Sequence, residues 1–191
     1  KTTEDGYWHV QTDKGTVFKA ATVFIAAGVG AFVKRGLSLP GFDELLGQQI
    51  FHAAPTPTSF KGKHLVVLGD SDAALAACAQ WRQGPAAAAS VTLVHRRDQF
   101  QAEPQAIKDM RQACANQAMR FVAGQPTGLV QANGQLTGLE ILNSEGDTEA
   151  LPADALLLCL GVSPKLGPIS DWGLAMERKQ LPVNTETYAT D

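Results

Sequence analysis

Cysteine is scarce in this sequence, and none of its cysteines has the spacing of a local redox or metal centre. The chain of 191 residues contains 3 cysteines, Cys78, Cys114 and Cys159, which are far apart and form no C-x-x-C motif. Zinc sites and redox dithiols typically bring cysteines together at such short spacing. The scarcity argues against both, and it is typical of proteins from a reducing compartment such as the cytoplasm.

An excess of basic residues and a long hydrophobic run are also absent. Lys and Arg number 16 against 19 Asp and Glu, so the formal net charge is −3. No large positive field is available for nucleic acid or an anionic membrane. Apolar runs such as residues 155–160 are far shorter than the roughly 20 residues that cross a bilayer, and no signal peptide is recognisable. We therefore expect a cytoplasmic protein that binds neither nucleic acid nor membranes.

What the sequence does contain is a pattern that occurs twice. Residues 8–28 and 140–161 each begin with an alternating strand, continue through a Gly-containing turn and a second strand, and end in an apolar strand followed by glycine. Alternation is typical of half-buried strands, and the apolar runs at 22–26 and 155–160 are typical of strands buried on both faces. The similarity predicts two copies of one structural unit.

Only the second copy is preceded by alternating strands and helices. We expect strands over residues 63–68, 90–97 and 119–124, helices over about 73–81 and 103–118, and a tight hairpin turn at Asn133-Gly134. This order predicts an α/β fold, a Rossmann-like three-layer nucleotide-binding domain with a parallel sheet and an antiparallel β-meander. The equivalent elements for the first copy would precede residue 1, so we expect the chain to be part of a longer protein.

A glycine-poor loop joins the first of these strands to the first helix. It reads GDSDAA over residues 69–74, where a dinucleotide site usually has a second glycine in place of Ser71. Because the loop opens a helix, the helix amides are expected to face a pyrophosphate, a contact weakened by the serine, the neighbouring acids and any positive φ. The alternative is a plain turn in which the first glycine only allows the bend. The residues expected at the pyrophosphate are Gly69, Asp70, Ser71, Asp72 and Ala73.

The end of the second strand carries two adjacent arginines, Arg96 and Arg97, after His95. An NAD site usually places a carboxylate there for the ribose hydroxyls, whereas guanidinium groups suit a phosphate dianion. We therefore expect the 2′-phosphate of NADP at this point; the alternative is a solvated surface turn. His95 either stacks on the adenine or only caps the strand. Gly161, at the end of the last strand, is expected on the nicotinamide side of the crevice.

Three stretches carry a resemblance to a known family: GKHLVVLGDSDAAL (62–75), VHRRDQFQAEP (94–104) and LGVSPKLGPISDWGL (160–174). Together they resemble the thioredoxin-reductase-like flavoproteins, and the third is similar in particular to the ferredoxin–NADP+ reductases of this type. The resemblance implies an NADP-binding domain at 53–166 that interrupts an FAD-binding domain. Residues 1–52 would then end the first FAD-domain segment and form a hinge, and 167–191 would form the return hinge.

The same resemblance implies a function for the intact protein. Such enzymes are usually homodimers that pass electrons from NADPH through FAD to ferredoxin or flavodoxin. NADP would bind to this chain and FAD only to the intact protein, so the chain alone is expected to be inactive. Because the cofactors carry the hydride chemistry, no catalytic side chain and no metal ligand is expected.

The sequence departs from the family pattern at several positions. Asp70 and Ser71 stand where two glycines are usual, and Gln101, still expected at the nucleotide, stands where an arginine commonly completes the 2′-phosphate site. HAAP (52–55) stands where thioredoxin reductases carry their C-x-x-C, which argues strongly against reduction of a protein disulfide. Two alternatives remain: a flavoprotein of the same architecture with another electron acceptor, and a nucleotide-binding sensor module without turnover.

Overall fold

The structure is a computed structural model that describes residues 6–26, 31–165, 167–177 and 180–190. Its contacts divide the chain into two compact units. The first comprises Lys34–Gly161, and the second comprises Lys1–Val33 together with Val162–Asp191. The two units are described separately.

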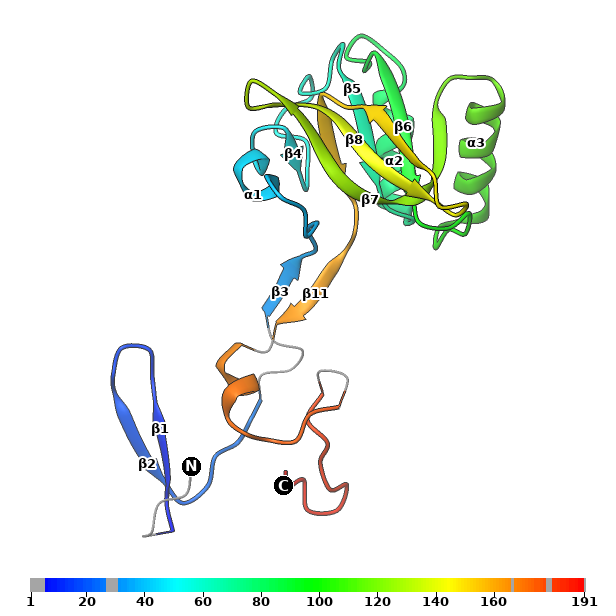
Figure 1. Cartoon of the computed structure of the whole chain (residues 1–191). Coiled ribbons are helices and arrows are strands. Elements are labelled where there is room, and N and C mark those ends of the chain that lie inside the picture. The colour runs from blue at the N-terminus through cyan, green and yellow to red at the C-terminus, as the bar shows by residue number, and fades with distance from the viewer. Residues whose placement is uncertain (1–5, 27–30, 166, 178–179, 191) are drawn as a thin grey trace. The chain divides into compact units, whose positions relative to one another are not determined.

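A seven-stranded mixed sheet forms the centre of the unit Lys34–Gly161 (Figure 1). Its first five strands run parallel, as expected when helices connect neighbouring strands, and its last two are antiparallel hairpin partners. In spatial order the strands are β4 (Ile50–Phe51), β10 (Ala155–Leu158), β5 (His64–Leu68), β6 (Ser90–His95), β7 (Arg120–Ala132), β8 (Gln135–Asn143) and β9 (Thr148–Pro152).

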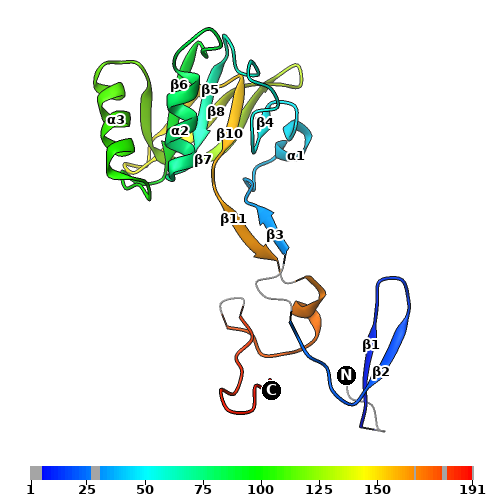
Figure 2. The same cartoon turned by 180° about the vertical axis from the view of Figure 1, so that it is seen from behind.

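Two hydrophobic layers cover the two faces of the parallel strands. Helices α2 (Asp72–Trp81) and α3 (Pro104–Ala115) pack on one face, and Figure 2 shows α2 lying over β5 and β6. Within β5, Val67 faces this helical layer and Val66 faces the opposite layer, which is built by the meander and by the short helix α1 (Phe42–Leu45). Helices, sheet and meander form three layers, which confirms the predicted fold class.

The strand β7 joins the parallel and antiparallel parts of the sheet. Its first residues pair with β6 and the remainder pairs with β8, and the register with β8 shifts between Pro126 and Gly128 and again between Val130 and Gln131. The strand therefore continues well past residue 124, where the sequence pattern predicted its end. The turn that follows has φ values of 52° at Asn133 and 73° at Gly134, so the predicted tight hairpin is confirmed.

The second unit contains short strands and one 3-10 helix. β1 (Trp8–Gln11) and β2 (Val17–Ala20) form a hairpin, β3 (Ala31–Lys34) pairs with β11 (Val162–Lys165), and η1 (Gly167–Asp171) follows. The hairpin agrees with the first copy of the predicted repeat, whose final Gly28 lies outside the described residues.

The prediction of an apolar strand at residues 22–26 is wrong. These residues are irregular, and the side chain of Phe24 is 90% exposed. A strand buried on both faces needs neighbours that accept its hydrogen bonds and cover its side chains. No strand in the described ranges pairs with this segment, so the apolar pattern alone does not produce a strand here.

Candidate functional site

Three of the predicted site segments meet at one edge of the parallel sheet. Leu68 at the end of β5 is in register with Val94 on β6 and with Leu158 on β10. Gly69 and Gly161 therefore follow their strands at the same edge at which His95 closes β6. Ligands of open α/β sheets bind outside this carboxyl edge.

Gly69 is required by the packing of the sheet itself. Its φ is 150°, and a Cβ at this position would lie 2.5 Å from the carbonyl oxygen of Cys159. Its amide donates to the carbonyl of Val94 at 3.1 Å. The glycine thus allows two strand ends to approach each other, a role that needs no ligand.

Ser71 begins helix α2 with an extended backbone. Its φ of −95° and ψ of 169° are ordinary values for a residue that precedes a helix, so the strain considered for a positive φ is absent. Its hydroxyl forms no capping hydrogen bond to the helix. The first amides of α2, those of Asp72 and Ala73, have no acceptor within the helix because the first turn never provides one.

Two hydrogen bonds from backbone amides of the loop after β6 connect it to the loop after β5. The amide of Gln101 donates to the carbonyl of Asp70 at 2.8 Å, and the amide of Glu103 donates to the carboxylate of Asp72 at 2.8 Å. Asp72 therefore braces the start of α3 against the start of α2. The predicted phosphate loop therefore also connects the starts of the two helices.

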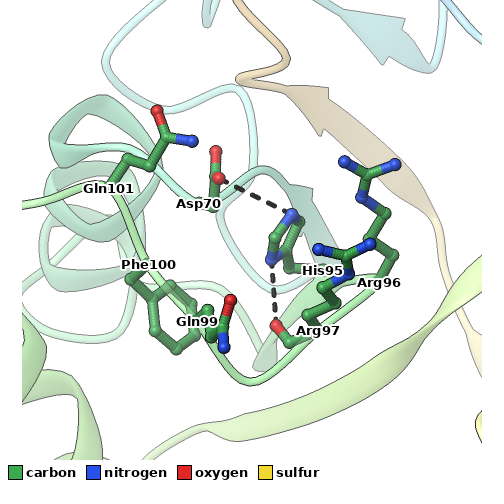
Figure 3. Close-up of a pocket in the computed structure, with 7 residues that line it drawn as sticks. All are labelled: Asp70, His95, Arg96, Arg97, Gln99, Phe100 and Gln101. Carbon is green, nitrogen blue, oxygen red and sulfur yellow. Dashed lines mark hydrogen bonds and ion pairs between the residues drawn. The ribbon is translucent and has the colours of Figure 1, made fainter.

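Five of the ten predicted site residues line a hollow of about 200 Å³ beside the end of β6 (Figure 3). We call it the β6 hollow. Gly69, Ser71, Asp72, Ala73 and Gly161 do not line it. Gln99 and Phe100 also line it, although they were not among the predicted site residues. Their position between Arg97 and Gln101 is the signal in the sequence that could have identified them. The full lining is Asp70, His95, Arg96, Arg97, Gln99, Phe100 and Gln101.

The aromatic ring of Phe100 anchors the wall of the hollow. It packs edge-on against Phe121 at 5.2 Å between ring centroids, and the Arg111 guanidinium lies 6.0 Å from its centre. Arg111 also holds Asp98 through two hydrogen bonds of 2.8 and 3.2 Å. This contact raises the pKa of Arg111 and engages the acid that directly follows the arginine pair.

His95 is held between two acceptors. Its Nδ1 is 2.9 Å from the carbonyl oxygen of Arg97, and its Nε2 is 3.6 Å from a carboxylate oxygen of Asp70. Because a carbonyl can only accept, Nδ1 carries the hydrogen and donates it. The ring thus caps the end of β6 and faces the hollow with its other nitrogen.

The guanidinium groups of the two arginines of the hollow have no partner among the described residues. Arg96 and Arg97 are exposed, and within the part of the chain that the structure describes neither guanidinium forms a hydrogen bond or an ion pair. Guanidinium groups offer several donors in a planar fork that matches phosphate oxygens. The hollow can therefore receive an anion without first breaking an internal salt bridge.

None of the three cysteines lines the β6 hollow. Cys78 is buried between the sheet and α2, and Cys114 and Cys159 pack against the same hydrophobic layer. Burial raises the pKa of each of the three thiols, which favours the protonated thiol over the thiolate at neutral pH. Across the described ranges, no group of histidine, cysteine or acidic residues is arranged to hold a metal ion. The helices in those ranges all fall short of the length and apolar character that a membrane crossing requires.

The sequence matches a family model described as pyridine nucleotide-disulphide oxidoreductase over residues 2–191. A ferredoxin–NADP reductase from Paracidovorax citrulli is 50% identical over 196 residues, covering 97% of this chain and 54% of that protein. One from a Polaromonas species is 46% identical over 193 residues, covering 98% of this chain and 52% of that protein. The chain thus spans about half the length of the curated relatives it matches.

Solved structures share the fold at lower sequence identity. Thioredoxin reductase from Lactococcus lactis aligns with a TM-score of 0.66 at 20% identity, over 99% of this chain and 60% of that chain. A bacillithiol disulfide reductase from Bacillus cereus aligns with a TM-score of 0.67 at 14% identity, over 97% and 56%. At these identities the likeness concerns the architecture.

Proposed function

The chain belongs to the pyridine nucleotide-disulphide oxidoreductase family, and from this premise we propose that it is the NADP(H)-binding part of an FAD-dependent reductase. The intact protein would pass electrons from NADPH through FAD to ferredoxin or flavodoxin. The observation that carries the proposal is the pair of unpartnered arginines, Arg96 and Arg97, in the β6 hollow at the carboxyl edge of a parallel sheet. The names of the relatives at 46–50% identity support the same reading.

The residues of this chain would bind and orient the nucleotide. Arg96 and Arg97 would hold the 2′-phosphate, because charge-assisted hydrogen bonds from guanidinium groups are strong and directional. Gln101 would add a neutral hydrogen bond, and the first amides of α2 would face the pyrophosphate. Gly161, at the same sheet edge, would approach the nicotinamide. When bound, NADPH and the flavin supply the hydride chemistry.

The domain assignment forms part of the proposal. The flanking segments would belong to an FAD-binding domain, and the compact unit Lys34–Gly161 would be the nucleotide-binding domain. Phe42, Leu45 and Ile50 are part of the core of this unit. We therefore place the boundary near residue 34 instead of near residue 52. The intact protein would be a cytoplasmic homodimer.

Titration of the 191-residue chain with NADPH and with adenosine 2′,5′-bisphosphate tests the nucleotide site. Both ligands carry the 2′-phosphate, so we expect heat of binding for both in calorimetry and weaker binding of NADH. Absence of binding by either 2′-phosphate ligand would contradict the assignment. Reduction of ferredoxin by NADPH with the longer protein would then test the electron acceptor, and NADPH binding without any turnover would favour the sensor alternative.

Protein-disulfide reduction receives no support from this chain. The segment 52–55 contains no cysteine, and all three thiols pack in or against one hydrophobic layer with raised pKa values. A dithiol that exchanges with a substrate disulfide must be accessible and able to form a thiolate. We therefore favour an electron-carrier protein over thioredoxin as the acceptor.

A further inference from the structure

Asp70 occupies a position in the β6 hollow at which a phosphate site would not be expected to place an acid. We propose that Asp70 is a specificity-determining residue. Its carboxylate repels the 2′-phosphate and so weakens the preference of this site for NADP(H) over NAD(H). The inference rests on the proposed function, because it concerns the same nucleotide site.

Asp70 lines the hollow, and its carboxylate is close to the imidazole of His95. It lies 3.6 Å from Nε2 of His95, and the Asp70 side chain is only 29% exposed. Figure 3 shows the carboxylate directed toward the imidazole ring, in the hollow that Arg96 and Arg97 also line. The acid therefore faces the region assigned to the 2′-phosphate.

The backbone around Asp70 is held on both sides. A Cβ at the preceding Gly69 would lie 2.5 Å from the carbonyl oxygen of Cys159, so the backbone packs closely there, and the carbonyl of Asp70 accepts the amide of Gln101 at 2.8 Å. The point at which the Asp70 side chain leaves the backbone is therefore set by the sheet and by the facing loop. A ligand that enters the hollow must bind in the presence of this carboxylate.

A carboxylate in this position has opposite effects on the two nucleotides. It repels a 2′-phosphate, which carries nearly two negative charges at neutral pH. It can accept hydrogen bonds from a free ribose hydroxyl, as the acid of an NAD site does. The hollow therefore combines an NADP feature, the two arginines, with an NAD feature, the acid at position 70.

The other acids of the two loops do not have this position. The carboxylate of Asp72 accepts the amide of Glu103 at 2.8 Å and does not line the hollow. Asp98 is paired with Arg111 at 2.8 Å and does not line it either. The proposed effect is therefore specific to Asp70.

The test compares Asp70→Asn with the parent in the 191-residue chain. Calorimetry gives the Kd of adenosine 2′,5′-bisphosphate and of adenosine 5′-monophosphate, and the ratio of the two constants is the measure of selectivity. Removing the repelling charge should shift this ratio about tenfold toward the 2′-phosphate ligand. Asp98→Asn is the matched control, because it removes the same charge from the facing loop at a residue that does not line the hollow; it should leave the ratio unchanged.

The outcomes separate this inference from the proposed function. If the parent binds the 2′-phosphate ligand and Asp70→Asn leaves the ratio unchanged or lowers it, the inference is wrong while the proposed function stands. A shift as large in Asp98→Asn would also overturn it. If neither ligand binds to the parent or to the folded variant, both are wrong. Should Asp70→Asn melt well below the parent, Asp70→Gly provides the same charge removal with the residue usual in the family.

Discussion

Replacement of Arg96 with alanine should weaken NADPH binding about tenfold and leave the stability of the fold unchanged. The guanidinium is exposed and has no hydrogen bond or ion pair with any described residue, so its removal leaves no buried partner unpaired. A hydrogen bond to a charged group contributes roughly 1.5–3 kcal/mol. Because Arg96 is exposed, the lower end applies, and about 1.4 kcal/mol corresponds to a factor of ten in Kd.

The assay is calorimetric titration of the parent and the variant with NADPH and with NADH. NADH lacks the 2′-phosphate, so its Kd should hardly change in the variant. Arg111→Ala is the matched control, since this arginine lies close to the same loop but is paired with Asp98 at 2.8 Å and does not line the β6 hollow. Its effect on NADPH should be much smaller than that of Arg96→Ala.

Two results would refute the reasoning about Arg96. Equal losses for NADPH and NADH would show that the arginine shapes the loop and does not recognise the phosphate. An equal loss in Arg111→Ala would show that only the general positive field of this region matters, an effect that would also fade with added salt.

Three further predictions concern Gly69, the three thiols and Ser71. Gly69→Ala should lower the free energy of unfolding in urea by about 2–4 kcal/mol, because its Cβ would meet the Cys159 carbonyl at 2.5 Å and its φ is 150°. The control Gly84→Ala, with φ 86° and open space around it, should lower it by only about 1–2 kcal/mol. Equal losses in the two variants would contradict the packing argument. Alkylation of the thiols at neutral pH should be slow in the folded chain and fast in urea, since burial raises all three pKa values; rapid labelling of the folded chain would mean that a thiol is accessible. Ser71→Gly should tighten NADPH and NADH by the same few-fold factor in calorimetry, because the pyrophosphate is common to both; weaker binding of the variant would identify the hydroxyl as a ligand.

Local sequence patterns were sufficient to predict the main strands and helices of the unit Lys34–Gly161 and the sheet edge at which the candidate site lies. Local hydrophobic pattern predicts the strands at 64–68 and 90–95 and the helix between them. These elements could therefore be predicted without knowing which other segments pack against them. The arginine pair could be placed for the same reason: parallel strands end at the same edge, and Arg96 directly follows β6.

The contacts that the loop residues make, in contrast, come from the tertiary structure. The glycine at position 69 is required by a carbonyl at position 159, and the carboxylate of Asp72 is bound by an amide at position 103. The carboxylate of Asp70 lies 3.6 Å from Nε2 of His95, a contact that no local pattern predicts. Such contacts join residues that are remote along the chain, and side-chain direction in a loop depends on them rather than on local periodicity.

The segment 22–26 shows the same limit for a strand. Its apolar pattern resembles that of residues 155–160, yet β10 (Ala155–Leu158) lies between β4 and β5 while no described strand pairs with 22–26. A strand is completed by hydrogen bonds to its neighbours, which are tertiary contacts. Hydrophobic pattern indicates where this protein can form strands and helices. Whether a given apolar segment becomes a strand depends on the neighbouring strands with which it can pair.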